Sequence, residues 1–473
     1  MKTKLQLFAV VVIAAVATLF AQGPLTPPGA PAPMMKTLDQ IEARKPITGP
    51  GAGTISVSGS YYLTTNIAVI AGNAITITAD NVTLDLNGFT LSSTEASPNG
   101  TGVLLSGDRK HIHILNGHIQ GNVSYSAGTY GGSGFAYGVR SSGGSFLRNA
   151  RVTGVSVSGC LQDGINIQGS ISSVAESCTV QTVGGSGIVA GSVSHSTAKQ
   201  CGLTGITASV ASDCLGESTG NSPGVGALHA HNCTGLSSGS GHGVNATTAQ
   251  NCAGTSFSTG NGVSANVAQS CYGTSFGSGN GVKAETAENC AGSSTTGAGN
   301  GVDADTATNC KGYSGGSGHG VYARTAQNCH GQANSGFGID AEVATSCNGT
   351  SSTSVGVRSL GTASNCYGVS AGDGIGVSVR YTASNCVGSS QSGAGVQAGV
   401  ALNCIGVSES GGTGVVAGNV FTGNGIAQNC LGVTTGTGVS ATIAIGCYGG
   451  VTANPRVSTF KQYFCGTGPN PYP

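Results

Sequence analysis

The chain lacks tryptophan and is poor in several residue types that most globular proteins use freely. Only 8% of its 473 residues are charged, 5% are aromatic and three are methionine. So few charged residues exclude a coiled coil or a long exposed helix, which need abundant Glu, Lys and Arg. Eighteen basic residues balance eighteen acidic ones, so electrostatic attraction to nucleic acid or to an anionic membrane is not expected. Disorder is not expected either, because 38% of the residues are hydrophobic and the net charge is zero.

Glycine and cysteine are present in excess, with 83 and 17 residues. Twelve cysteines from Cys233 to Cys447 recur at intervals of 17–20 residues with one exception. Each lies in a frame close to Gly-(Asn/His)-Gly-Val-x-Ala-x-x-Ala-x-Asn-Cys-x-Gly. Similarity at a fixed short period is typical of stacked coils, in which each repeat covers the hydrophobic face of its neighbour. The repeat therefore predicts one elongated body rather than several compact domains.

The frame also predicts the course of the chain within one coil. In Gly262-Val-Ser-Ala265 the Val and Ala share one face of a strand, and we expect both to point inward. In Ala268-Gln-Ser-Cys271 the two apolar residues are three apart, so a bend must consume one residue. Asn usually precedes Cys, and Asn tolerates the left-handed backbone conformation that such a bend needs. Stacked Asn amides are then expected to hydrogen-bond from coil to coil.

The cysteines are predicted to be mostly reduced and buried. Residues in the same slot of successive coils lie about 4.8 Å apart, whereas the Cβ atoms of a disulfide prefer about 3.5–4.5 Å. Systematic bridging between coils is the alternative, because many cysteines in an exported protein usually indicate disulfides. Cys465 lies outside the frame and is expected to be the most exposed thiol.

The two ends of the chain differ from its middle. Lys2 and Lys4 precede an apolar run that ends at Phe20, which predicts a signal peptide over residues 1–21 and export to the cell surface or the medium. A membrane anchor is the alternative, but the run is shorter than the ~20 residues of a comfortable span. No transmembrane segment is expected after cleavage. Residues 22–50 are predicted to be a Pro-rich lead and N-terminal cap, with a helical turn in Thr37–Arg44, and residues 454–473 a C-terminal tail.

Three motifs in the N-terminal half carry a family resemblance. Gly59-Ser-Tyr-Tyr-Leu63, Asn81-Val-Thr-Leu-Asp-Leu-Asn-Gly-Phe-Thr-Leu91 and Ile112-His-Ile-Leu-Asn-Gly117 resemble the opening of exported bacterial proteins of the pectin-lyase-like fold. The resemblance implies an all-β, single-stranded right-handed parallel β-helix over residues 51–453, with about 19 residues per coil in the C-terminal part. That family includes lyases, hydrolases and adhesins, so the fold by itself settles no activity.

If Val and Ala point inward, the residues beside Ala point outward in two stacked columns. These columns hold an unusual share of the few charged residues, on a footprint of about 15–20 Å. Carboxylates and Arg can bind sugar hydroxyls and Tyr can stack on a sugar ring, so the face suits a polysaccharide. A plain solvated face is the alternative. The candidate ligand-binding residues are Lys283, Glu285, Asp303, Asp305, Tyr322, Arg324, Asp340 and Glu342.

A catalytic role for this face is a further alternative. Asp303 and Asp340 are expected to lie near 9–10 Å apart at the backbone, and inverting glycosidases hold their carboxyl groups about 6.5–9.5 Å apart. The paired-aspartate motifs of the family's hydrolases are absent, however. The sequence therefore favours a secreted or surface β-helix protein that is non-catalytic and binds polysaccharide, or acts as an adhesin or scaffold. A polysaccharide lyase or glycoside hydrolase remains the alternative.

His111, His113 and His118 form a second polar cluster, near Asp108. Pairs of histidines on one strand face occur in metal sites. No Cys or further carboxylate falls at a convincing spacing, so we expect no metal and no cofactor.

Overall fold

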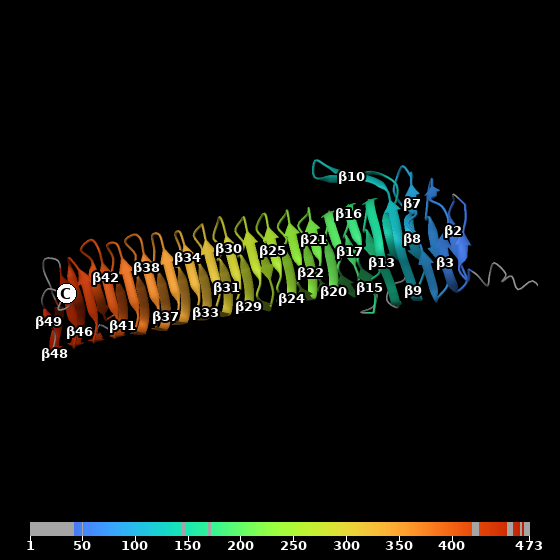
Figure 1. Ribbon diagram of the computed structural model, residues 1–473. Coiled ribbons are helices and arrows are strands. Elements are labelled where there is room, and N and C mark those ends of the chain that lie inside the picture. The colour runs from blue at the N-terminus through green and yellow to red at the C-terminus, as the bar shows by residue number, and fades with distance from the viewer. Residues whose placement is uncertain are drawn as a thin grey trace, which may run out of the picture. The chain divides into compact units, whose positions relative to one another are not determined.

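The computed structural model describes residues 42–49, 51–142, 147–168, 172–418, 425–451, 457–463 and 466–467. The chain divides into two units, residues 1–45 and 46–473, and the second contains nearly all the described structure. It is a β-solenoid of about 21 coils, with parallel strands that recur about 19 residues apart (Figure 1). The predicted all-β stack of coils is confirmed. The predicted signal peptide, Pro-rich lead and most of the cap lie outside the described residues, and Glu42–Arg44 are not helical.

Three columns of parallel strands build the first part of the solenoid, after β1 (Lys45–Ile47). The first column contains β2 (Gly53–Ile55), β5 (Ile75–Ile77), β8 (Thr101–Leu105), β12 (Tyr137–Ser141), β14 (Ile165–Asn166) and β17 (Ile188–Val189). The second contains β3 (Gly59–Leu63), β6 (Val82–Asp85), β15 (Val174–Glu176) and β18 (Ser192–Ser194). The third contains β4 (Ile67–Val69), β7 (Thr90–Ser93), β16 (Thr179–Val183) and β19 (Thr197–Cys201). Two long strands, β9 (Lys110–Gln120) and β13 (Arg148–Cys160), run through the second and third columns.

From residue 206 onward the first two columns usually merge into one bent strand per coil. These strands are β20 (Ile206–Ser212), β22 (Val225–His231), β24 (Val244–Gln250), β29 (Val282–Glu288), β31 (Val302–Thr308), β33 (Val321–Gln327), β35 (Ile339–Thr345), β37 (Val357–Ser364), β39 (Val377–Ser384), β41 (Val396–Leu402) and β46 (Thr437–Ile445). In two coils the strand is split, as β26 (Val263–Ser264) with β27 (Val267–Gln269) and as β43 (Thr413–Ala417) with β44 (Ile426–Gln428).

The third column continues as one short strand after each Cys. It contains β21 (Leu215–Ser218), β23 (Thr234–Ser237), β25 (Ala253–Ser256), β28 (Tyr272–Ser275), β30 (Ala291–Ser294), β32 (Lys311–Ser314), β34 (His330–Ala333), β36 (Asn348–Ser351), β38 (Tyr367–Ser370), β40 (Val387–Ser390), β42 (Ile405–Ser408), β45 (Leu431–Thr434) and β47 (Tyr448–Val451). β48 (Val457–Tyr463) and β49 (Gly466–Thr467) follow.

The bend before each Cys has the predicted left-handed backbone. The φ angle is 52° at Asn251 and 54° at Asn289, and Ser270 takes the same conformation at 53°. The side-chain amides also stack as expected: Asn385 Nδ2 donates to Asn365 Oδ1 at 3.3 Å, and Asn403 Nδ2 donates to Asn385 Oδ1 at 3.2 Å. Asn is therefore favoured here for two reasons: it tolerates a left-handed backbone, and its side-chain amide hydrogen-bonds to the Asn of the next coil.

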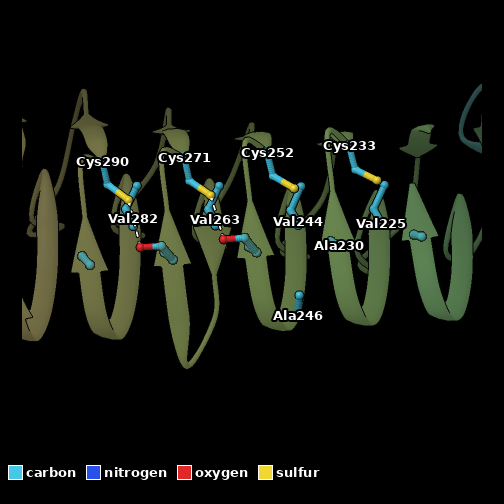
Figure 2. Close-up of a cluster of buried hydrophobic side chains, with 14 of the residues drawn as sticks. Val225, Ala230, Cys233, Val244, Ala246, Cys252, Val263, Cys271, Val282 and Cys290 are labelled. Carbon is cyan, nitrogen blue, oxygen red and sulfur yellow. Dashed lines mark hydrogen bonds between the residues drawn. The ribbon is translucent and has the colours of Figure 1, made fainter. Parts of the chain in front are cut away.

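The interior of the regular coils holds a column of thiols beside a column of valines. Figure 2 shows the cysteines of four successive coils in one row, each next to the Val of its own coil. Cys233 Sγ donates to the His231 carbonyl at 3.3 Å, and Cys271 Sγ donates to the carbonyls of Ala249 and Gln269, both at 3.3 Å. Within the described residues sixteen cysteines are buried and none is in a disulfide, as predicted, and Cys465 lies outside this part.

Burial makes the thiols of Cys160, Cys178 and Cys201, in the coils before the regular repeats, poor nucleophiles. It raises the pKa of Cys160 to about 12, and it also raises the pKa of Cys178 and Cys201. A thiol that stays protonated behaves as a small hydrophobic residue rather than as a redox or metal-binding group. The cysteine column is thus part of the core.

One antiparallel hairpin interrupts the stack, formed by β10 (Asn122–Ser126) and β11 (Thr129–Ser133). Figure 1 shows it extending from the coils near β13 and β16. Tyr130 in the hairpin reaches later coils, where its hydroxyl donates to the Gln200 carbonyl at 2.9 Å and lies 2.9 Å from Thr219 Oγ1. Desolvation raises the pKa of Tyr130 to about 12, which is consistent with a role in holding the hairpin against the solenoid.

Candidate binding groove

A groove of about 540 Å³ crosses seven successive coils, from β24 to β37. Six steps of about 4.8 Å give it a length of roughly 29 Å along the stack. All eight residues predicted from the outward columns line it. The full lining is Asn245, Ala246, Ser264, Ala265, Asn266, Lys283, Ala284, Glu285, Asp303, Ala304, Asp305, Tyr322, Ala323, Arg324, Asp340, Ala341, Glu342 and Leu360.

The groove exists because Ala occupies the position where each bent strand turns. Its methyl group is too small to fill the outer angle, so one Ala in each of six coils forms the floor and the residues beside it form the walls. Leu360 lines the groove in the seventh coil. Ala323 and Ala341 are buried, as predicted, but Ala265 and Ala284 are only half-buried. The Ala that was expected to point fully inward therefore also forms the groove floor.

The exposed wall residues are held by a few direct contacts. Arg324 Nη2 lies 3.6 Å from Asp305 Oδ1, and both side chains are more than 60% exposed, so this ion pair contributes little to stability. Asp303 Oδ2 accepts a hydrogen bond from Asn280 Nδ2 at 2.9 Å. The ring of Tyr322 is 46% exposed beside them. The predicted outward orientation of Tyr322, Arg324 and Asp305 is confirmed.

Asp340 differs from the other predicted residues, because it is only 2% exposed. Arg358 closes over it with two hydrogen bonds, from Nε to Oδ1 at 2.8 Å and from Nη2 to Oδ2 at 2.6 Å. His319 Nε2 lies 3.5 Å from Oδ2 on the other side. The expectation of a solvent-facing Asp340 was wrong: the residue stands in an outward column, but its neighbours in the adjacent coils cover it.

The groups around Asp340 form a stack beside the groove. His319 is parallel to Phe337, with ring centroids 4.9 Å apart and planes 2° apart, and it lies 5.8 Å from the Tyr322 ring. The Arg358 guanidinium lies over the Phe337 ring, 4.1 Å from its centre. A Tyr–His–Phe–Arg series thus lies next to a buried carboxylate, and of its four members Tyr322 is the one that lines the groove.

Sequence reasoning missed His319, Phe337 and Arg358 as parts of the site. His319 stands where three preceding repeats have the Asn of Gly-Asn-Gly (Asn261, Asn280 and Asn300), and that substitution was the available signal. The position is an acceptor ladder: Asn280 Oδ1 accepts from the Asn300 N–H at 2.7 Å, Asn300 Oδ1 accepts from the His319 N–H at 2.8 Å, and His319 Nδ1 accepts from the Phe337 N–H at 3.0 Å. His319 replaces Asn as an acceptor, and its ring then reaches Asp340.

The hydrogen bond from the Phe337 N–H to Nδ1 determines which tautomer the neutral His319 imidazole adopts. Because Nδ1 accepts a backbone N–H, the neutral ring carries its proton on Nε2, which faces the Asp340 carboxylate. Burial is the main cause of a lowered His319 pKa, which nearby Arg358 lowers further and Asp340 partly offsets. His319 is therefore neutral around neutral pH, with its Nε2 proton on the side of Asp340.

A smaller hollow of about 220 Å³ lies on the third column of the same coils. Tyr272 and Tyr313 flank it, and the small residues of β30 form its base. Its charged or titratable side chains are Lys311 and His330, so it contains no carboxylate. This hollow was not predicted, because its residues vary from coil to coil and share no motif.

The histidine cluster in β9 does not form a metal site. His113 is half-buried, and its Nε2 lies 3.2 Å from Thr153 Oγ1, while His111 Nδ1 lies 3.4 Å from Asn149 Nδ2. Across the described ranges no group of three His, Cys, Asp or Glu residues is placed to hold a metal ion. The same ranges contain no helix with the length and hydropathy needed to cross a membrane.

The chain matches no protein-family model, and no curated protein or solved structure is significantly similar to it. The likeness to the pectin-lyase-like fold therefore rests on the N-terminal motifs and on the coil architecture.

Proposed function

We propose that the protein is an exported, non-catalytic β-solenoid of the pectin-lyase-like type that binds a polysaccharide along the groove. The observation that carries the proposal is the groove, in which polar side chains and an exposed tyrosine follow one another over six of its seven coils. A long, narrow site of this kind fits a linear polymer better than a small metabolite. Export rests on the signal peptide predicted for residues 1–21.

The groove is suited to binding because its residues are already in place. They stand on strands whose backbone hydrogen bonds run from coil to coil, so little conformational entropy is lost when a ligand is bound. The exposed ring of Tyr322, which packs against His319 on one side, offers a surface for one sugar ring. Exposed carboxylates and Arg324 offer hydrogen bonds to hydroxyl groups on either side.

Catalysis is the weaker proposal because one carboxylate of the candidate pair is already engaged. Asp340 makes two hydrogen bonds to Arg358 and faces His319, which holds it as a structural anion. An inverting hydrolase needs one carboxylic acid and one free base across the scissile bond. Release of reducing ends or unsaturated uronides from a glycan panel would contradict the non-catalytic proposal.

The test is the double variant Tyr322→Ala with Arg324→Ala. Glycan binding, measured by affinity electrophoresis or calorimetry, should weaken more than tenfold, while the melting temperature should stay within a few degrees because both side chains are exposed. Tyr367→Ala is the matched control, since Tyr367 is 45% exposed on the third column, outside the groove. Undiminished glycan binding by the double variant would place the site elsewhere and overturn the proposal.

A further inference from the structure

The balance of charge in the groove indicates the chemical class of its ligand. Its lining contains five carboxylates, against the two cations Lys283 and Arg324. Two of the carboxylates are matched within the protein: Asp305 faces Arg324 at 3.6 Å, and Asp340 is held by Arg358. Glu285, Asp303 and Glu342 remain, with Lys283 as the remaining cation. The groove therefore carries about two net negative charges.

This local excess is large for a chain whose formal net charge is zero. The three carboxylates lie on neighbouring or next-but-one coils, in β29, β31 and β35, so steps of about 4.8 Å separate successive coils. Only the step between Glu285 and Asp303 is shorter than the screening length of about 8 Å at physiological ionic strength, because Glu342 lies two coils beyond Asp303. Glu285 and Asp303 therefore act together on a charged ligand, and Glu342 adds a separate negative charge farther along the groove.

We propose that the groove takes a glycan that carries protonated amines, a polymer of 2-amino-2-deoxy sugars, in preference to a polymer of uronic acids. The inference rests on the proposed function and specifies its ligand. The Tyr322 ring provides the stacking surface, and Glu285, Asp303 and Glu342 pair with ammonium groups that recur along the polymer. A polyuronate would instead bring a carboxylate on each sugar unit against this row of acids.

The contrast with the hollow on the third column supports the assignment. That hollow has two tyrosines, a lysine and a histidine but no carboxylate, so it would not discriminate against an acidic sugar. Exposed aromatic rings alone therefore do not distinguish the two faces of these coils. The row of carboxylates does, and it occurs on the groove side.

The experiment compares three soluble polymers at pH 5.5, where Asp and Glu are ionised and glucosamine amines are protonated. They are a polymer of glucosamine, its fully N-acetylated oligomers and polygalacturonate. We expect the glucosamine polymer to bind at least tenfold more tightly than the N-acetylated form, with an affinity that falls as salt is raised. Glu285→Gln with Glu342→Gln should reduce its affinity to that of the N-acetylated form.

A matched control keeps the change in net charge and moves it away from the groove. Glu288→Gln with Glu409→Gln neutralises two exposed carboxylates on other surfaces, and it should leave the preference for the amine polymer intact. Preferential binding of polygalacturonate, or equal effects of the two double variants, would overturn this inference but leave the proposed function standing, provided that Tyr322→Ala with Arg324→Ala still abolishes binding. Failure of all three polymers to bind would contradict the proposed function itself.

Discussion

The two halves of the solenoid fill their interiors in different ways. In the N-terminal coils large aliphatic residues such as Ile75, Leu84 and Leu91 are fully buried, and paired residues in successive coils are up to 38 positions apart, as for Ile112 and Ala150. From residue 206 onward the inward residues are Val, Ala, Cys, Gly and Ser, and most successive coils differ by 18–20 positions. The same architecture is thus built once with a wide core and once with a narrow one.

The third column shows where the width is lost. Leu91 is the inward residue of β7, whereas the equivalent residue of β25 is Gly254. A Cβ atom on Gly254 would lie 1.9 Å from the Gly262 carbonyl oxygen. In the narrow coils the backbone on one side of the core therefore leaves no room for a side chain on the other. Flattened coils of nearly constant length keep their outward columns in register, and the groove begins in β24, within this regular part.

The comparison predicts that removing side-chain volume costs most in the wide coils. Leu84→Ala should lower the free energy of unfolding by about 2–5 kcal/mol, because it leaves a cavity in a fully buried aliphatic core. Cys290→Ala, at an equally buried position of a narrow coil, should cost only about 1 kcal/mol. Urea or thermal unfolding, followed by far-UV circular dichroism, measures both. Equal losses for the two variants would show that the cores do not differ as described.

Adding side-chain volume, by contrast, should destabilise the narrow coils. In Gly273→Ala the new methyl would lie 1.9 Å from the Gly281 carbonyl oxygen, which is backbone and has no room to move. Overpacking of this kind costs about 1–3 kcal/mol or more. Gly131→Ala in the hairpin is the control, because nothing lies within 4 Å of the added atom. If both variants unfold at the wild-type temperature, the narrow coils are looser than the contact distances indicate.

Much of this fold can be predicted from the repeat because equivalent residues of successive repeats contact one another. The spacing of Val, Ala and Cys identifies the inward faces, and Asn before Cys identifies the left-handed bend found at Asn251 and Asn289. The hairpin of β10 and β11 is not predictable in this way, since it occurs once. Its position depends on the contact of Tyr130 with Gln200, 70 residues away, which no local pattern indicates.

The candidate site was predicted in part for the same reason. The columns beside Ala follow from the strand period, so all eight residues were placed on one face. The concavity was not predicted, because it depends on the angle of the bend rather than on the order of residues. The burial of Asp340 was also missed, because it arises from Arg358 in the next coil and from His319 in the preceding one. A repeat pattern does not indicate the contacts that variable positions make between coils.

The smallest predicted effect concerns the pH dependence of the narrow coils and uses His242, which stands in the same ladder as His319. His242 Nδ1 accepts the Asn261 N–H at 3.0 Å, just as Asn261 Oδ1 accepts the Asn280 N–H at 2.9 Å. Burial, with a smaller effect of Lys283, lowers the His242 pKa below its usual 6.5. The unfolded chain therefore binds a proton more readily than the folded one, and stability falls as the pH drops below about 6.5.

His242→Asn should remove that dependence without loss of the hydrogen bond, because Asn fills the same role in neighbouring coils. We expect the variant to unfold at the wild-type temperature at pH 8, where the wild-type histidine is neutral in both states. At pH 5 it should unfold at a higher temperature than wild type, since it has no imidazole to protonate on unfolding. His229→Asn, at an exposed position, is the control and should follow wild type at both values. An equal shift for wild type and His242→Asn between pH 8 and pH 5 would mean that the ladder accepts a charged histidine, and the acceptor role assigned to Nδ1 would be wrong.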